Sequence, residues 1–144
     1  MSLRYFNVFG PRQDPNSEYA AVVARFILAA RSGVPLEIHG DGKQTRDFIY
    51  VENVVDANLL AAEAAGVAGE VFNVAGGERF SVLDLARGIE DVLRRPLPRR
   101  HTPARRGDVR DTLADISRAR ARLGFAPAVS FREGLRRTVE TFSA

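Results

Sequence analysis

Short apolar runs with the composition of β-strands are scattered along this chain, and helix-patterned segments separate them. The runs lie at Leu3–Phe9, Leu36–His39, Phe48–Val51 and Val71–Val74, where β-branched and aromatic residues favour strands. Strands that alternate with helices are typical of α/β folds, so we expect a mixed α/β unit. Because the runs lie far apart in the sequence, we do not expect them to form a complete sheet among themselves.

Five segments combine a helical spacing of apolar residues with start or stop signals. Ser81 with Asp84, and Ser130 with Glu133, have the spacing of a capping box, and Asp115 can cap a further helix. Helices are therefore expected at residues 22–30, 53–65, 82–93, 116–123 and 131–142. We find no repeat and no low-complexity linker, so residues 1–144 are interpreted as a single domain.

The composition excludes several kinds of site. The chain has no Cys, which excludes a disulfide framework, a thiolate nucleophile and a Cys-ligated zinc ion. It has no run of 18 apolar residues, so we expect no membrane span. The first residues lack the charged and then apolar pattern of a signal peptide, and we expect a cytoplasmic protein.

Positive charge is concentrated between Arg94 and Arg122. This stretch contains ten Arg and three Asp, although the net charge of the whole chain is only +3. The planar Arg fork matches phosphate geometry, so a phosphate-bearing partner is one interpretation. A solvated charged face is the other, with equal weight. Nucleic acid binding is a weaker interpretation, because no aromatic residues for base stacking are interleaved with the arginines.

Four motifs stand in register along the chain: LRYFNVFGPRQ at residues 3–13, GDGKQTRDF at 40–48, NVAGG at 73–77, and RRGDV at 105–109 with LAD behind it at 113–115. Together they resemble the extended short-chain dehydrogenase/reductase family, with UDP-glucose 4-epimerases as the nearest branch and dTDP-glucose dehydratases as cousins. The resemblance runs from Leu3 to Phe142. It implies a C-terminal nucleotide-sugar-binding lobe with an incomplete Rossmann sheet.

The resemblance implies a phosphate and ribose site. Asn7 would hydrogen-bond the sugar diphosphate, because an amide donates and accepts without adding charge. Arg46 and Arg105 would bind the phosphates, and Asp108 would accept hydrogen bonds from the ribose hydroxyls. Without the resemblance, Asn7 would be expected to cap a turn, and Arg46 to form a surface pair with adjacent Asp47.

The resemblance also implies contacts to the base, the sugar and the cofactor. The backbone of Val22 would meet the nucleotide, and the backbone at Ile38 and His39 would meet the uracil. Thr112 falls near a position that, in the family, influences how large a sugar the site accepts. The strand end formed by Tyr5, Phe6 and Asn7 would lie beside the nicotinamide and the sugar, with Phe6 on the substrate and Tyr5 on the cofactor.

The residues that perform the chemistry in this family are missing from these 144 residues. The family uses tightly held NAD, a Tyr, and a Lys four residues later. None of Tyr5, Tyr19 and Tyr50 precedes Lys43 at that distance, and the Gly40–Gly42 turn lacks the third glycine of a dinucleotide-binding turn. We therefore expect no catalytic residue here, and NAD only in the complete enzyme. The chain is interpreted as the C-terminal part of a longer enzyme, either truncated or half of a split one.

Several functions stay open. The chain could be the UDP-hexose-binding half of an NAD-dependent 4-epimerase, part of a dTDP-sugar 4,6-dehydratase, or a non-catalytic nucleotide-sugar-binding or interaction module. The strand predicted at Leu3–Phe9 would normally be buried on both faces in a parallel sheet. Alone it would expose unpaired edges and apolar surface. We therefore expect self-association, or association with a missing N-terminal half.

Overall fold

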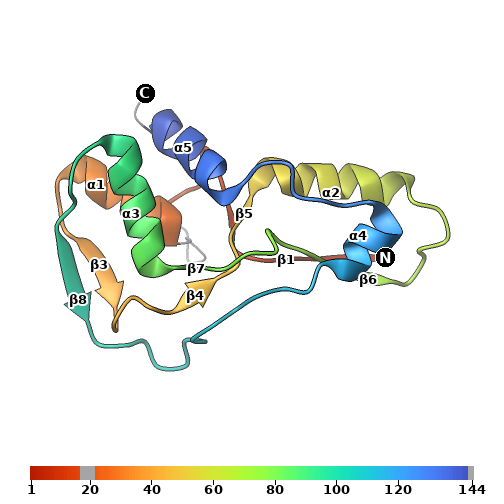
Figure 1. Cartoon of the computed structure of the whole chain (residues 1–144), viewed down its shortest axis with the longest axis horizontal. Coiled ribbons are helices and arrows are strands. Elements are labelled where there is room, and N and C mark those ends of the chain that lie inside the picture. Colours follow the sequence, from red (N-terminus) through yellow and green to blue (C-terminus); the bar gives the residue numbers. More distant parts are fainter. Residues whose placement is uncertain (17–21, 143–144) are drawn as a thin grey trace.

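The computed structural model describes residues 1–16 and 22–142, and it forms a mixed α/β fold (Figure 1). The helices are α1 (Val22–Ser32), α2 (Val51–Glu63), α3 (Val82–Leu93), α4 (Ser117–Leu123) and α5 (Phe131–Phe142). The strands are β1 (Ser2–Tyr5), β2 (Val8–Phe9), β3 (Leu36–His39), β4 (Thr45–Arg46), β5 (Ile49–Tyr50), β6 (Val71–Val74), β7 (Phe80–Ser81) and β8 (Arg99–Thr102).

The strands pair two by two and form no continuous sheet within the described residues. β1 with β6, β2 with β5, and β3 with β8 are parallel pairs, whereas β4 and β7 are antiparallel. The partners are far apart in sequence, with helices between them, as parallel pairing requires. The mixed α/β class and the incomplete sheet predicted from the sequence are confirmed.

Two of the predicted strands are wrong in extent. The run Leu3–Phe9 is broken between β1 and β2, because Asn7 has a φ of 21°, outside the β region. β1 pairs only with β6 among the described residues and is mostly exposed, in line with the exposure expected of this strand alone. The strand predicted at Phe48–Val51 keeps only two residues, and α2 begins at Val51, two residues earlier than predicted.

The helix starts follow the predicted caps only in part. Ser81 and Asp84 form the reciprocal capping box at α3. At α5 the Ser130 hydroxyl accepts from the Glu133 N–H at 3.3 Å, but the Glu133 carboxylate is directed to arginines instead. Asp115 is not the N-cap residue of α4, which is Ile116, but its carboxylate accepts from the N–H of Ser117, the first residue of the helix.

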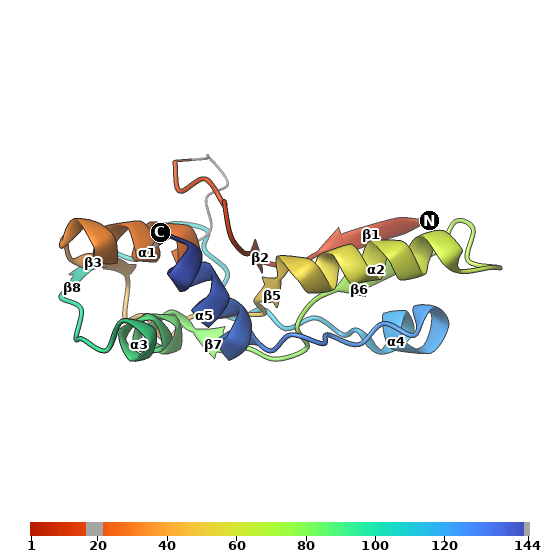
Figure 2. The same cartoon turned by 90° about the horizontal axis from the view of Figure 1, so that it is seen from above.

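Two apolar cores lie at opposite ends of an elongated molecule (Figures 1 and 2). One end contains α1, α3, α5 and the β3–β8 pair, with Phe9, Leu85 and Leu135 buried among them. The other end contains α2, α4 and the β1–β6 pair around Phe72 and Phe125. Burial of these side chains is the main stabilising contribution, about 1.5–3 kcal/mol for each large one.

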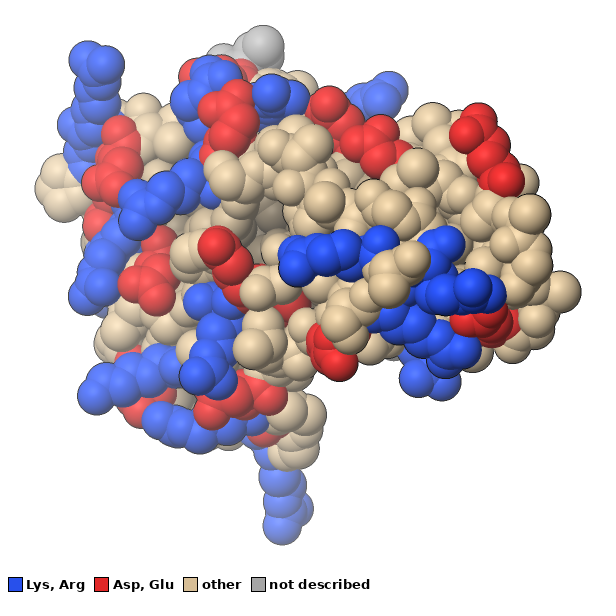
Figure 3. Space-filling view, turned by 45° about the vertical axis from the view of Figure 1, so that its right-hand side comes forward, with Lys and Arg blue, Asp and Glu red and all other residues tan. Residues whose placement is uncertain are grey.

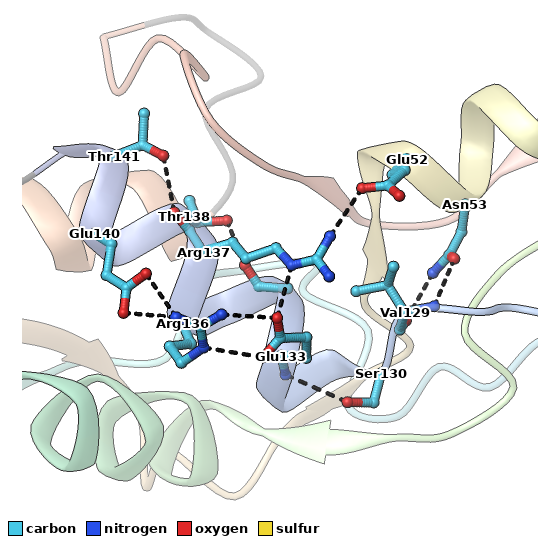
Figure 4. A network of polar contacts seen from close by, with 11 residues as sticks. Glu52, Asn53, Val129, Ser130, Glu133, Arg136, Arg137, Thr138, Glu140 and Thr141 are labelled. Atoms are coloured by element: carbon cyan, nitrogen blue, oxygen red, sulfur yellow. Dashed lines mark hydrogen bonds and ion pairs between the residues drawn. The ribbon is translucent and has the colours of Figure 1, made fainter.

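Polar contacts of α5 join the two ends (Figure 4). The Asn53 side chain on α2 donates to the Val129 carbonyl at 2.8 Å and accepts from the N–H groups of residues 128 and 129. Arg137 on α5 contacts both Glu133 and Glu52 at the start of α2. Because Asn53 is buried and makes three hydrogen bonds to this segment, it fixes the chain that leads into α5.

Candidate functional site

A cavity of about 720 Å³ lies between α1, the β3–β8 pair and the loop that follows β8. Cavities of this size commonly hold small organic ligands. One wall is the α1 face that carries Val22, Phe26 and Ala29, which recur at helical spacing. The cavity is lined by Asn7, Val22, Arg25, Phe26, Ala29, Val34, Pro35, Glu37, His39, Gln44, Arg46, Phe48, Val82, Arg100, Arg105 and Asp108.

Six of the nine predicted substrate-binding residues line this cavity: Asn7, Val22, His39, Arg46, Arg105 and Asp108. They come from different segments of the chain, including the β1–β2 break, α1, β3, β4 and the turn at 105–108. The fold therefore brings residues together that lie up to a hundred positions apart. Their binding roles stay predictions.

Arg46 is held in place on the cavity wall. Its Nη1 donates to the Thr45 carbonyl at 2.7 Å, and its Nη2 pairs with the Asp108 carboxylate. Only 16% of the Arg46 side chain is exposed, so the pair is less screened than a surface one. The alternative pairing of Arg46 with adjacent Asp47 is wrong, because Asp47 is directed into the interior.

Asp47 is a buried residue that the sequence interpretation overlooked. Its Oδ1 accepts from the Gly76 N–H at 2.8 Å and from Gly77 at 3.2 Å, and its Oδ2 accepts from Ala114 at 3.1 Å. Burial raises the pKa of Asp47 above its ordinary value, although these N–H groups act in the opposite direction. A Cβ at Gly76 would lie 2.5 Å from the Phe48 carbonyl oxygen, so only Gly fits there.

Asn7 lies where β1 ends and β2 begins. Its Nδ2 donates to the Asp47 carbonyl at 3.0 Å, and Asn is among the residues that tolerate a positive φ. One N–H of the amide and the Oδ1 atom have no partner among the described residues, and Asn7 lines the cavity. Asp47 thus contacts both Asn7 and the segment that follows the 105–108 turn.

His39 is tied to the neighbouring strand. Its Nδ1 lies 2.8 Å from the Thr102 hydroxyl on β8, and its carbonyl accepts from Gln44 Nε2 at 2.8 Å. Gln44 also lines the cavity and was not predicted. These contacts orient His39 as part of the wall, and no cluster of His, Asp and Glu in the described ranges 1–16 and 22–142 could hold a metal ion.

Four predicted residues lie away from the cavity lining. Phe6 packs against the small cluster of Ala75, Ala114 and Ile116. The Ile38 side chain is fully buried in the larger core, while its backbone runs along β3 beside the cavity.

Thr112 donates its N–H to the Thr45 carbonyl, and its buried hydroxyl has no partner among the described residues. Tyr5 is 49% exposed and donates to Asn58 Oδ1 at 2.9 Å. The structure gives none of these four a direct place in the cavity wall.

Most arginines of the basic stretch are engaged within the protein. Six of its ten arginines make hydrogen bonds or ion pairs: Arg95, Arg99, Arg100, Arg110, Arg118 and Arg122. Figure 3 shows blue and red side chains side by side over one face of the molecule. The solvated-face interpretation therefore describes most of this stretch. Arg105, on the cavity wall, is one of those that remain unpaired in the described chain.

No helix among residues 1–16 and 22–142 has the length and apolar character needed to cross a bilayer.

Comparison with known proteins gives consistent matches. A sequence profile of the NAD dependent epimerase/dehydratase family matches residues 1–75. The UDP-glucose 4-epimerase of Mycolicibacterium smegmatis is 43% identical over 136 residues, which cover 94% of this chain and 43% of that protein. The UDP-N-acetyl-alpha-D-glucosaminuronate decarboxylase of Bacillus cytotoxicus is 33% identical over 146 residues, covering 97% of this chain and 45% of that protein.

Solved structures agree with these matches. The UDP-glucose 4-epimerase of Thermotoga maritima with UDP-glucose superposes with a TM-score of 0.92 at 43% identity, covering 99% of this chain and 45% of that one. The UDP-glucuronic acid 4-epimerase of Bacillus cereus with UDP-glucuronic acid and NAD superposes with a TM-score of 0.91 at 34% identity, covering 98% of this chain and 44% of that one. The chain thus spans less than half the length of these relatives.

Proposed function

Because this chain belongs to the NAD dependent epimerase/dehydratase family, we propose that it forms the nucleotide-sugar-binding part of a UDP-hexose 4-epimerase. The observation that carries this proposal is the cavity beside α1, which gathers six predicted binding residues from five segments. Relatives that are 4-epimerases of UDP-sugars support the choice of ligand class.

The proposed binding mode follows from the charges of the cavity wall. Arg46 and Arg105 bind the diphosphate, because guanidinium groups match phosphate oxygens in charge and geometry. Asp108 accepts from the ribose hydroxyls once the diphosphate draws Arg46 away from it. The base lies between the apolar face of α1 at Val22 and the strand that carries His39. The sugar then extends toward Asn7, whose side-chain amide oxygen accepts a hydrogen bond from a sugar hydroxyl.

The described residues do not fit NAD. A dinucleotide site needs a glycine-rich turn that leads from a strand into a helix, so that the pyrophosphate meets the helix N-terminus. The Gly40–Gly42 turn instead leads from β3 to β4. We therefore derive no hydride transfer from this chain and propose that NAD is held by residues outside these 144. Tyr5 would border that cofactor only in the complete enzyme.

An exposed apolar surface beside β1 has the character of a packing site for another part of the protein. Val51, Val55 and Leu59 recur every four residues on α2 and are 38–59% exposed. Tyr5 joins β1 to this helix through Asn58. We call Tyr5, Val51, Val55 and Leu59 the β1–α2 face. An apolar stripe next to a strand with one free edge is a surface that another element commonly covers. We propose that the NAD-binding part of the enzyme, or a second copy in its absence, packs there.

A non-catalytic nucleotide-sugar-binding module is the second candidate. The absence of a Tyr-x-x-x-Lys sequence in these 144 residues favours it. Both candidates bind the same ligand, and they differ in whether an NAD-binding part restores turnover. A dTDP-sugar is an alternative ligand, since one matched relative is a dTDP-L-rhamnose 4-epimerase.

Calorimetric titration tests the proposal. The chain is titrated with UDP-glucose, UDP-N-acetylglucosamine and dTDP-glucose, and the titrations are repeated with Arg46→Ala, Arg105→Ala and Arg106→Ala. Arg106 is exposed and does not line the cavity, so Arg106→Ala is the matched control. We expect binding that Arg46→Ala and Arg105→Ala each weaken about tenfold or more, with Arg106→Ala near wild type. No binding by a folded chain, or equal losses in all three variants, would contradict the proposal.

A further inference from the structure

The charges of the cavity wall do not balance. Four arginines and two carboxylates line the cavity. Two of the arginines are paired within the wall, Arg46 with Asp108 and Arg100 with Glu37. The other two, Arg25 and Arg105, have no hydrogen bond or ion pair from their side chains within the described residues. Both are exposed, and two unpaired cations on the wall of one cavity favour an anionic ligand there.

Arg25 is the one of these two that family resemblance did not single out. It lies on α1 between Val22 and Ala29, on the helix face that forms the cavity wall. Its immediate neighbours, Val23, Ala24 and Phe26, are buried in the core and hold the helix in place. The Arg25 backbone is therefore rigid, while its side chain is free to move to a ligand.

The surroundings of Arg25 strengthen an interaction with an anion. Phe26, Ala29, Val34 and Pro35 form an apolar stretch of the same wall. Apolar groups exclude water and lower the effective dielectric constant, so a charge pair formed there is stronger than one in open solvent. Arg25 and Arg31 are both exposed on α1, but Arg31 does not line the cavity and lacks these apolar neighbours.

We propose that Arg25 is a diphosphate-binding residue, which acts from the α1 side while Arg105 acts from the opposite side. The inference rests on the proposed function and deepens it. The two uncompensated guanidinium groups then supply one charge for each phosphate of a nucleotide sugar. Arg46 contributes a third guanidinium when the ligand displaces it from Asp108, and the released carboxylate turns to the ribose.

The test uses two matched substitutions on one helix. Arg25→Gln and Arg31→Gln remove the same charge from α1, but only the first removes it from the cavity wall. Arg105→Gln is the positive control. Each variant is titrated with UDP-glucose and with inorganic pyrophosphate at two salt concentrations. We expect Arg25→Gln to weaken both ligands about tenfold or more and to reduce the salt dependence of binding, since one ion contact is lost. Arg31→Gln should stay within about twofold of wild type.

A charge-retaining variant sharpens the result. Arg25→Lys keeps the positive charge and loses the fork, so we expect an affinity between those of wild type and Arg25→Gln. Thermal melting of each variant shows that it is folded. If Arg105→Gln weakens UDP-glucose binding while Arg25→Gln matches Arg31→Gln, the Arg25 inference is overturned and the proposed function stands. If the folded wild-type chain binds neither UDP-glucose nor pyrophosphate, both are overturned.

Discussion

At the residue scale, the organisation of the site depends on Asp47. Its carboxylate is buried and accepts N–H groups from the turn after β6 and from Ala114. Its carbonyl holds the side chain of Asn7, and its neighbour Arg46 lines the cavity. One residue thus joins the break at Asn7, the turn after β6 and the segment at Ala114.

Removing the negative charge of Asp47 tests this arrangement. In Asp47→Asn the new amide turns an N–H toward backbone donors, and each buried donor left without an acceptor costs about 1–3 kcal/mol. We expect the free energy of unfolding to fall by about 2–4 kcal/mol, measured by urea denaturation. Asp56→Asn, at an exposed position on α2, should change it by about 0.5 kcal/mol or less. Similar urea denaturation midpoints for the two variants would show that the Asp47 carboxylate does not stabilise the fold in this way.

Asp47 also shows the limit of sequence interpretation at this scale. Adjacent Arg46 and Asp47 look like a surface pair, yet side chains of neighbouring residues in extended backbone point to opposite sides. Arg46 faces the cavity and Asp47 faces the interior. The partners of Asp47 lie 29 and 67 positions away, and no local pattern identifies such partners. The helical spacing of residues 22–30 predicted α1, in contrast, but the place of Arg25 in the cavity wall is seen only in the structure.

At the element scale, α5 is anchored by a network centred on Glu133 (Figure 4). Hydrogen bonds from Arg136 and then Arg137 lower the pKa of Glu133 to about 2. Because the folded-state pKa lies below the ordinary value of 4.5, the stabilisation is fully present above that value. It is lost as the pH falls toward about 2.

This linkage predicts how Glu133→Gln behaves. Near pH 7 the substitution should lower the melting temperature of the chain, and the difference from wild type should shrink as the pH is reduced below 4.5. The effect is modest and weaker in high salt, because the residues are exposed to solvent. Melting curves at a series of pH values measure it, with Glu63→Gln on α2 as an exposed control. A difference that is constant with pH would rule out the ionic origin.

Local sequence signals predicted the boundaries of helices and strands correctly where those signals are strong. The predictions failed where tertiary contacts compete. The capping box at Ser81 and the glycine after α4 mark the observed ends. The run Leu3–Phe9 has uniform strand composition, but β1 pairs with β6 while β2 pairs with β5. The chain must turn at Asn7 to reach both partners, and composition cannot indicate two different partners.

At the scale of the whole molecule, the β1–α2 face is an exposed apolar surface within the described residues. Leu59 is 59% exposed and Val55 is 52% exposed, although both lie on a helix whose other face is packed in the core. We expect the chain alone to form dimers or larger species in sedimentation velocity experiments. Leu59→Asp should shift them toward monomers, because a charge in an apolar contact is costly to desolvate.

Leu113→Asp is the control for this experiment, since Leu113 is 53% exposed in a segment outside the β1–α2 face. It should leave the sedimentation profile unchanged. A well-folded wild-type monomer at all concentrations would contradict the expected self-association. It would also remove the main physical support for a docking surface at β1 and α2.

The central claim is that this chain carries a nucleotide-sugar site beside α1, and amide NMR titration with UDP-glucose tests it most directly. We expect shifts concentrated at Asn7, Val22, His39 and the 105–108 turn, with Gly88 on α3 and Arg136 on α5, which do not line the cavity, unaffected. The same spectrum shows whether the chain is folded. A folded chain whose amide signals do not move, or move only away from this cavity, would contradict the account.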